Sequence, residues 1–185
     1  MKATDFISDV LSEIRENIKF LEAKNAAIIT LNSALIAWGG SIVFDSEIVR
    51  KYRILVSIFV VLLFLPLIVS LYSFMPFSII SGRKTRSFLC RLSKDSVPPA
   101  DPHKTMYYAY ICCNYGSDIN KYYNDIKDTN DDSSPSVREQ QRILQVFDLA
   151  EVAYKKSLLF NASAKSESFI FVLGCIVTIV KLLTC

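Results

Sequence analysis

The chain has 185 residues, of which 51% are apolar and only five are glycine, and its formal net charge is +3. This length suits about one domain, the apolar content exceeds that of an ordinary soluble protein, and so small a charge argues against a nucleic-acid partner. The only histidine is His103, no two cysteines have C-x-x-C spacing, and no nucleotide-binding, protease or hydrolase motif occurs. We therefore expect no enzyme: no catalytic residue, no metal and no cofactor.

Residues 1–24 predict an amphipathic helix that continues into a membrane. Their apolar residues recur every three or four positions, along one face of a helix: Phe6, Val10, Leu11, Ile14, Ile18 and Leu21. No glycine or proline separates this segment from the uncharged run 25–44, and about 20 apolar residues are sufficient to cross a bilayer. We expect one helix to extend from the cytoplasm into the membrane, with an apolar stripe that needs a partner helix.

The first membrane segment also contains polar side chains, among them Asn32. An amide exposed to lipid would leave its donors and acceptor without partners, so Asn32 must face another helix or a water-filled path. Both interpretations stay open. The hydroxyls of Thr30 and Ser33 can bond to their own helix backbone. Small residues further along allow close approach of a second helix: Ala34, Ala37, Gly39 and Gly40.

A run without charge from Ile54 to Gly82 predicts the second membrane helix. With the first, it forms a transmembrane hairpin over residues 25–82 that is joined by a short outer loop. Pro66 lies midway along this helix and removes one backbone hydrogen bond. The kink that it favours either shapes the helix or marks where the helix moves.

Basic residues set the expected orientation. Five of them follow the hairpin, and the positive-inside rule places them in the cytoplasm: Arg83, Lys84, Arg86, Arg91 and Lys94. The N-terminus is then cytoplasmic, and the C-terminus lies outside. The outer loop carries Arg50, Lys51 and Arg53, which oppose this orientation, but the cluster at 83–94 is larger.

Residues 83–165 predict a cytoplasmic helical region. A proline-rich linker (93–104) precedes an aromatic segment that suits either a short helix or a strand. Gly116 and Ser117 then indicate a helix stop and a new N-cap. The tyrosines around this point suit a buried core or a pocket that stacks on a nucleobase.

A long helix is predicted from residue 137 onward, because its apolar residues keep helical spacing into a third uncharged run, 168–180. That run has only about 13 residues, which is short for a span, but the side chain of Lys181 can reach the headgroups. We expect a third transmembrane helix over 166–185 that is continuous with a long cytoplasmic helix. The fold class is an all-α membrane protein. Cys112 and Cys113, in the cytoplasmic region, are expected to stay reduced.

Three segments carry motifs in a distinctive order. The first, "EAKNAAIITLNSAL" (22–35), has an acidic-x-Lys motif before an apolar run with an inner Asn. The second, "YYAYICCNYGSDINKYYNDI" (107–126), joins an aromatic stretch to a short tyrosine-containing helix. The third, "QVFDLAEVAYKKSLLFNA" (145–162), begins with Gln145 and has Lys156 eleven residues on. In this order, and with the hairpin, the chain resembles the Pycsar effector transmembrane family of bacterial anti-phage defence over nearly its whole length.

The resemblance implies a bacterial inner-membrane effector that a cyclic pyrimidine mononucleotide, cCMP or cUMP, activates. A partner cyclase makes this nucleotide upon phage infection, and the activated effector impairs the membrane and stops the infected cell. The C-terminus would then be periplasmic. We also expect a homo-oligomer in the bilayer and no nucleic-acid partner. The alternatives are a non-catalytic membrane adaptor and a holin-like pore that no nucleotide gates.

The chemistry of a nucleotide suggests the contact residues. Lysines suit the phosphate, amides the base edge and tyrosines the base face. The candidate nucleotide-binding residues are Lys24, Asn25, Tyr107, Tyr108, Gln145 and Lys156. For packing or gating in the membrane, the candidates are Asn32, Trp38 and Pro66.

Overall fold

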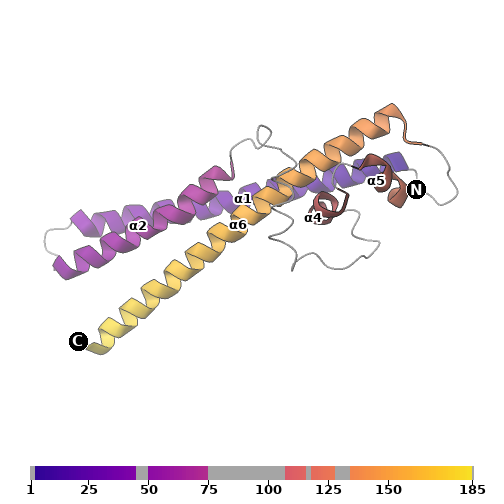
Figure 1. Cartoon of the computed structure of the whole chain (residues 1–185). Helices are drawn as coiled ribbons and strands as arrows, with labels where there is room; N and C mark the ends of the chain where they lie inside the picture. The colour runs from indigo at the N-terminus through magenta and orange to yellow at the C-terminus, as the bar shows by residue number, and fades with distance from the viewer. Residues whose placement is uncertain (1–2, 45–49, 75–106, 116–117, 128–133, 185) are drawn as a thin grey trace. The chain divides into compact units, whose positions relative to one another are not determined.

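The computed structural model describes residues 3–44, 50–74, 107–115, 118–127 and 134–184 (Figure 1). Within these ranges every regular element is a helix and no strand occurs, so the predicted all-α fold class is confirmed. The predicted basic cluster, the proline-rich linker and the tip of the outer hairpin lie outside the described residues.

Three long helices dominate the described chain (Figure 1). Helix α1 (Ala3–Phe44) has 42 residues, α2 (Arg50–Tyr72) has 23 and α6 (Val137–Thr184) has 48. Each contains a segment long and apolar enough to cross a membrane. The predicted N-terminal hairpin is confirmed, and so is a C-terminal membrane helix that continues a long amphipathic one.

The chain divides into two compact units. Unit 1 consists of residues 1–21 and 76–157, and unit 2 of residues 22–75 and 158–185. Helices α1 and α6 each run through both units, with one part in unit 1 and the other in unit 2. The predicted domain boundaries after residues 24, 82 and 165 follow hydropathy rather than chain contacts, and they stay predictions.

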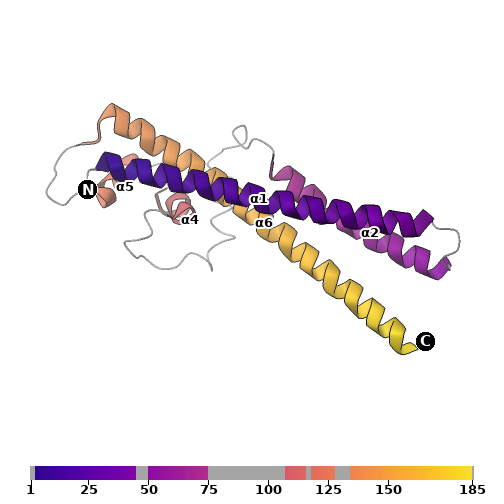
Figure 2. The same ribbon diagram turned by 180° about the vertical axis from the view of Figure 1, so that it is seen from behind.

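Unit 1 packs short helices against the amphipathic parts of α1 and α6 (Figure 2). The short elements are α4 (Tyr108–Tyr110), the π-helix η3 (Ile111–Tyr115) and α5 (Ile119–Ile126). The aromatic segment is therefore helical. Of the stripe predicted on the first helix, Val10, Leu11 and Ile14 are in this core, and Phe6 and Ile18 pack against it partly buried. The core is apolar and aromatic: Ile7, Val10, Leu11, Ile14, Ile111, Tyr115, Tyr122, Tyr123, Ile143, Val146, Phe147, Ala150 and Ala153.

Side chains define where the helices of unit 1 begin. The carboxylate of Asp118 accepts a hydrogen bond from the backbone N–H of Lys121 at 3.0 Å, so Asp118 is the N-cap of α5. The expected cap, Ser117, is one residue too early. At the start of α6, Ser136 and Glu139 form a reciprocal capping box, because each side chain accepts a bond from the other's backbone N–H.

The two neighbouring cysteines of unit 1 differ in state. Cys112 is a buried free thiol, whereas Cys113 is disulfide-bonded. The expectation that both stay reduced is therefore wrong for Cys113. It was based on the usual redox state of a compartment, which does not determine which thiols the fold brings together.

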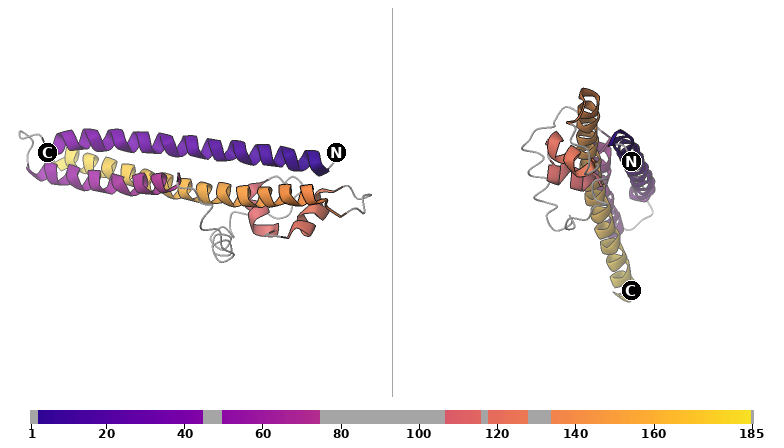
Figure 3. Two further views of the ribbon diagram at one scale, coloured as in Figure 1. Left: turned by 90° about the horizontal axis from the view of Figure 1, so that it is seen from above. Right: turned by 90° about the vertical axis from the view of Figure 1, so that its right-hand side faces the viewer.

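Unit 2 brings α1, α2 and the C-terminal half of α6 side by side (Figure 3). A Cβ atom added at Gly39 would lie 2.5 Å from a methyl of Val60, so α1 and α2 touch closely at this glycine. One added at Gly174 would lie 3.1 Å from the ring of Phe59. The outward side chains of this unit are large and apolar, as lipid contact requires, and include Val61, Leu65, Ile68, Phe169 and Val172.

Candidate functional site

One complete turn of α6 at the end of unit 1 is buried on every side. Ala153, Tyr154, Lys155 and Lys156 are each less than a tenth exposed. The ammonium of Lys155 lies 2.7 Å from a carboxylate oxygen of Glu151, one turn earlier. Buried lysines are rare because desolvation disfavours their charge. Two in succession make this turn unusual among the buried positions of the fold.

Tyrosines from the start of α4 lie near this turn. The rings of Tyr107 and Tyr108 are 4.8 Å apart and tilted by 40°. The pKa of Tyr107 is raised, chiefly by partial burial. Electrostatic repulsion from Tyr108, a hydrogen bond with Tyr108 and electrostatic repulsion from Tyr154 raise it further. Tyr107 nevertheless remains 45% exposed. We call Tyr107, Tyr108, Tyr154, Lys155 and Lys156 the tyrosine–lysine cluster.

The cluster has the chemistry to hold a small phosphorylated aromatic ligand. An ammonium attracts a phosphate oxygen as a point charge, and the open face of a tyrosine ring can stack on a base. Of the candidate nucleotide-binding residues, the structure brings Tyr107 and Tyr108 together and places Lys156 in the same unit.

The other candidate nucleotide-binding residues lie elsewhere. Gln145 is exposed on α6, and the eleven residues that separate it from Lys156 correspond to about 16 Å along a helix. Lys24 and Asn25 belong to unit 2. The ammonium of Lys24 lies 5.2 Å from the centroid of the Phe160 ring, and Asn25 is fully buried, with its amide nitrogen donating to the hydroxyl of Ser73 at 2.9 Å.

The candidates for membrane packing or gating occupy different environments in unit 2. Asn32 is fully buried, and neither its amide nitrogen nor its carbonyl oxygen has a hydrogen-bond partner. Trp38 is 62% exposed and lines an apolar pocket with Phe59 and Phe171. Pro66 is buried within α2, and its carbonyl accepts a hydrogen bond from Ser163 at 3.0 Å.

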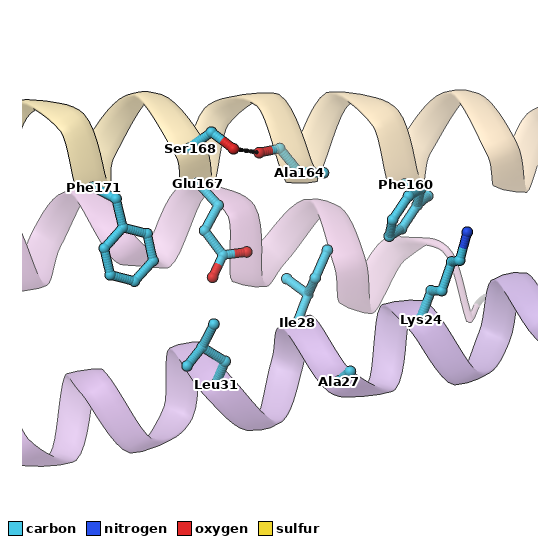
Figure 4. Close-up of a pocket in the computed structure, with 9 residues that line it drawn as sticks. All are labelled: Lys24, Ala27, Ile28, Leu31, Phe160, Ala164, Glu167, Ser168 and Phe171. Carbon is cyan, nitrogen blue, oxygen red and sulfur yellow. Dashed lines mark hydrogen bonds between the residues drawn. The ribbon is translucent and has the colours of Figure 1, made fainter.

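A groove between α1 and α6 in unit 2 contains a carboxylate. Glu167 is 6% exposed, and its Oε1 atom has no hydrogen-bond partner. Figure 4 shows this side chain extending from α6 toward α1, with Ile28 and Leu31 opposite it. Lys24 lines the same groove, whose volume is about 450 Å³.

Several polar residues of this interior were not predicted from the sequence. Ser70 and Ser163 share a hydrogen bond of 2.7 Å between their hydroxyls. Ser73, which follows the end of α2, and Glu167 of α6 are buried as well. Their spacing of three and four residues is the available signal: it places Ser163 and Glu167 on one helix face. Asn25 and Asn32, seven residues apart, share a face of α1 in the same way.

The fold and these sites define a class of protein. Three helices can cross a membrane, the part of the chain that the structure describes contains no group of metal-binding side chains, and a separate helical unit carries buried lysines and tyrosines. This is a helical membrane protein with a non-membrane domain.

Comparison with known protein families identifies the group. A family model described as the Pycsar effector protein domain matches residues 6–185, nearly the whole chain, and the chain belongs to this family. The resemblance inferred from the motifs is confirmed, and membership makes this a membrane effector of Pycsar anti-phage defence. No curated protein and no solved structure matches the chain.

Proposed function

We propose that this effector resides in the bacterial inner membrane and is activated by cCMP or cUMP, upon which it impairs the membrane and stops the infected cell. Family membership supports the setting in anti-phage defence. The observation that carries the proposal is the tyrosine–lysine cluster, in which two buried lysines of α6 and the paired rings of Tyr107 and Tyr108 belong to unit 1.

In this proposal the cluster is the nucleotide sensor. The ammonium of Lys156 meets the cyclic phosphate, and the rings of Tyr107 and Tyr108 stack on the pyrimidine. Lys155, already paired with Glu151, keeps the turn in place. The same turn leads directly into the membrane part of α6. A nucleotide shifts the effector toward an active state only if it binds that state more tightly than the resting one.

The membrane assignment includes an orientation. We propose a cytoplasmic N-terminus and a periplasmic C-terminus, so that the sensor faces the compartment in which a partner cyclase makes the nucleotide. Hydrogen bonds join α1 to Ser73 and α2 to α6 within one copy, and we propose that several copies assemble in the bilayer. Reporter fusions at either terminus, active only on one side of the membrane, test the orientation.

Thermal unfolding of the detergent-solubilised full chain tests the ligand. The midpoint is measured during parallel titrations with cCMP, cUMP, cAMP and cGMP. A ligand that binds only the folded form raises the midpoint as its concentration increases. At 100 times its Kd it adds about 2.7 kcal/mol to the free energy of unfolding. A rise with one cyclic pyrimidine alone supports the proposal and identifies the signal. A folded sample that responds to none of the four contradicts it.

A matched pair of variants tests the site. Lys156→Met keeps the apolar stem of the buried lysine but removes its charge, and should abolish the nucleotide-dependent rise. Lys165→Met makes the same change at an exposed position of α6 and should leave the rise intact. Equal responses in the two variants would exclude Lys156 from the site.

Expression without nucleotide separates the two alternatives. A holin-like pore would be toxic when produced alone, whereas a nucleotide-gated effector would require its cyclase. A membrane adaptor would be harmless under both conditions.

A further inference from the structure

The interior of unit 2 is more polar than its surface. Among the described residues of this unit, the buried positions are Asn25, Asn32, Gly39, Leu63, Pro66, Ser70, Ser73, Ser163, Glu167 and Ile170. More than half of these side chains are amides, hydroxyls or a carboxylate. Side chains that face outward from the same helices are mostly aliphatic or aromatic. Hydrogen-bonded hydroxyls and amides are common where membrane helices pack, but helix packing does not require a buried carboxylate.

Four of the buried polar atoms have no hydrogen-bond partner. They are Oδ1 of Asn25, both side-chain polar atoms of Asn32 and Oε1 of Glu167. Each such atom costs about 1–3 kcal/mol when it stays dry, and more in lipid, where no bulk water competes. Unpartnered atoms of this kind usually indicate ordered water. All four come from helices that the hydroxyl bonds of Ser70, Ser73 and Ser163 hold together.

We propose that the polar interior of unit 2 is a water-binding track that conducts protons across the membrane when the effector is active, with Glu167 as its titratable group. The inference depends on the proposed function for the trigger, and it specifies the damage as a proton leak. Asn25 and Asn32 lie two turns apart on one face of α1, a distance of about 10 Å that a few waters can bridge. Glu167 gives up a proton to this water and takes one from it.

The hydroxyl contacts explain why the track is closed in the structure. The hydroxyls of Ser70 and Ser163 touch directly at 2.7 Å, and that of Ser163 also donates to the Pro66 carbonyl at 3.0 Å. No water fits between atoms so close. Glu167 lies one helical turn beyond this contact, on the same face of α6. A small separation of α2 and α6 at Ser163 would admit water and connect the two ends of the track.

The track is closed at the contact of Ser70 with Ser163, where the two hydroxyl oxygens are 2.7 Å apart, and a small opening there favours protons over larger ions. A hydrated metal cation requires several oxygen ligands around it, whereas a proton requires only a chain of water and hydroxyl groups. Lys24 is the other ionisable residue that lines the groove of Glu167, and the buried hydroxyls of Ser70, in α2, and Ser73, just after it, belong to the same unit. A carboxylate with this setting in a membrane protein is typical of a proton relay.

Proton flux into vesicles tests the proposal. The full-length protein is reconstituted with a pH-sensitive dye inside, and flux is measured under an imposed potential, with and without each cyclic nucleotide. A second vesicle preparation traps a bulky anionic dye. We expect nucleotide-dependent entry of protons without loss of the bulky dye. Glu167→Gln, which keeps the size and shape of the side chain but cannot titrate, and Asn32→Leu should reduce the flux to that of protein-free vesicles. Wild-type flux in Glu167→Gln would overturn the proposal, as would release of the bulky dye with the same dose dependence as proton entry.

A second arm decides the matter without any nucleotide. Ser163→Gly removes both hydroxyl contacts and leaves room for water, so this variant should conduct protons constitutively, and adding Glu167→Gln should stop the flux. Ala162→Gly has a similar backbone cost in the same helix, but at an exposed position, and should stay closed. If vesicles that contain Ser163→Gly stay impermeable to protons, the proposed track is wrong. If the unaltered protein merely fails to respond to the nucleotides, only the proposed trigger is contradicted.

Discussion

Units 1 and 2 bury opposite kinds of side chain. Unit 1 has an apolar and aromatic core. In it the ring of Tyr122 lies edge-on to the rings of Phe147 and Tyr115, with distances between ring centroids of 5.5 Å and 5.0 Å. Unit 2 buries Asn32 and Glu167 and exposes apolar side chains. The first arrangement is that of a water-soluble domain, which burial of apolar surface stabilises. In lipid that driving force between helices is absent, so packing contacts and hydrogen bonds must hold the second unit together.

The difference indicates where each unit can respond. A close-packed apolar core resists small displacements, and in unit 1 the exceptions are the charged residues of the tyrosine–lysine cluster, where a ligand can act. Unit 2 depends on a few hydroxyl contacts, such as that of Ser70 with Ser163. Each is worth about 1 kcal/mol, so little energy separates its closed arrangement from an opened one.

The largest effect is expected from an aromatic truncation in unit 1. Phe147→Ala removes a buried ring beside Tyr122 and should destabilise this unit by about 3–5 kcal/mol. Thermal loss of the near-UV tyrosine signal measures unit 1, and the fluorescence of Trp38, the only tryptophan, reports on unit 2. The exposed Leu144 provides the control, because Leu144→Ala should change the midpoint little. Equal losses in both variants would contradict an ordinary apolar core in unit 1.

A substitution at a helix contact sharpens the comparison from the side of unit 2. Gly39→Ala places a methyl against the stiff side chain of Val60 and should destabilise the α1–α2 pair by about 1–3 kcal/mol. Gly40→Ala, one residue further, meets nothing within 4 Å and should be neutral or slightly stabilising. Unfolding of the hairpin in a denaturing detergent, followed by the fluorescence of Trp38, measures both. If Gly40→Ala is the worse variant, the contact face of α1 is misassigned.

The sequence was sufficient to predict the long helices. In lipid, backbone groups must form their hydrogen bonds within the segment, so a long uncharged run has to be a helix. Helical spacing of apolar residues predicts the amphipathic parts, and α1, α2 and α6 agree with both rules. Short-range chemistry was harder to predict. Asp118 rather than Ser117 caps α5, because both residue types suit an N-cap and only the path of the chain selects one.

The candidate site was predicted in part. A buried Asn32 follows from the cost of exposing an amide to lipid, and a tyrosine-rich core, one of the two interpretations of that segment, follows from composition. Ser163 and Glu167 were missed because a hydroxyl or a carboxylate next to an apolar run also suits the membrane surface. The role of such a side chain depends on the helix that packs against it. Ser163 is buried here because its hydroxyl bonds to that of Ser70 in α2. Such pairs are separated by many residues in the chain and leave no local pattern.

Alkaline pH should distinguish the two cores. Burial raises the pKa of Tyr122 above its ordinary value, and burial followed by a hydrogen bond with Asp125 raises that of Tyr115. The folded state therefore keeps protons that the unfolded state releases. This contribution is complete below about pH 10, and for Tyr122 it falls by about 1.4 kcal/mol per pH unit above that value until the folded pKa is reached.

Tyr122→Phe isolates this contribution. The variant cannot ionise at this position, so the tyrosine signal of unit 1 should lose stability less steeply above pH 10 than in the unaltered chain, with the remaining slope due to Tyr115 and other groups. Thermal midpoints collected across that pH range measure the slope. An unchanged slope would show that water reaches Tyr122 in the folded state.

The smallest effect is expected at the start of α6, where one residue contributes both to a helix cap and to a contact between helices. Ser136→Ala removes the hydroxyl of the capping box and should destabilise unit 1 by about 1 kcal/mol. Ser134→Ala, outside the box, is the matched control. Glu139 also accepts a hydrogen bond from Thr4 of α1 at 3.0 Å, so Glu139→Ala loses the box and this contact together. If Glu139→Ala destabilises unit 1 no more than Ser136→Ala, the contact with Thr4 is negligible, and the apolar core with the hydrogen bond from Arg142 to Ser8 holds α1 to α6 in this unit.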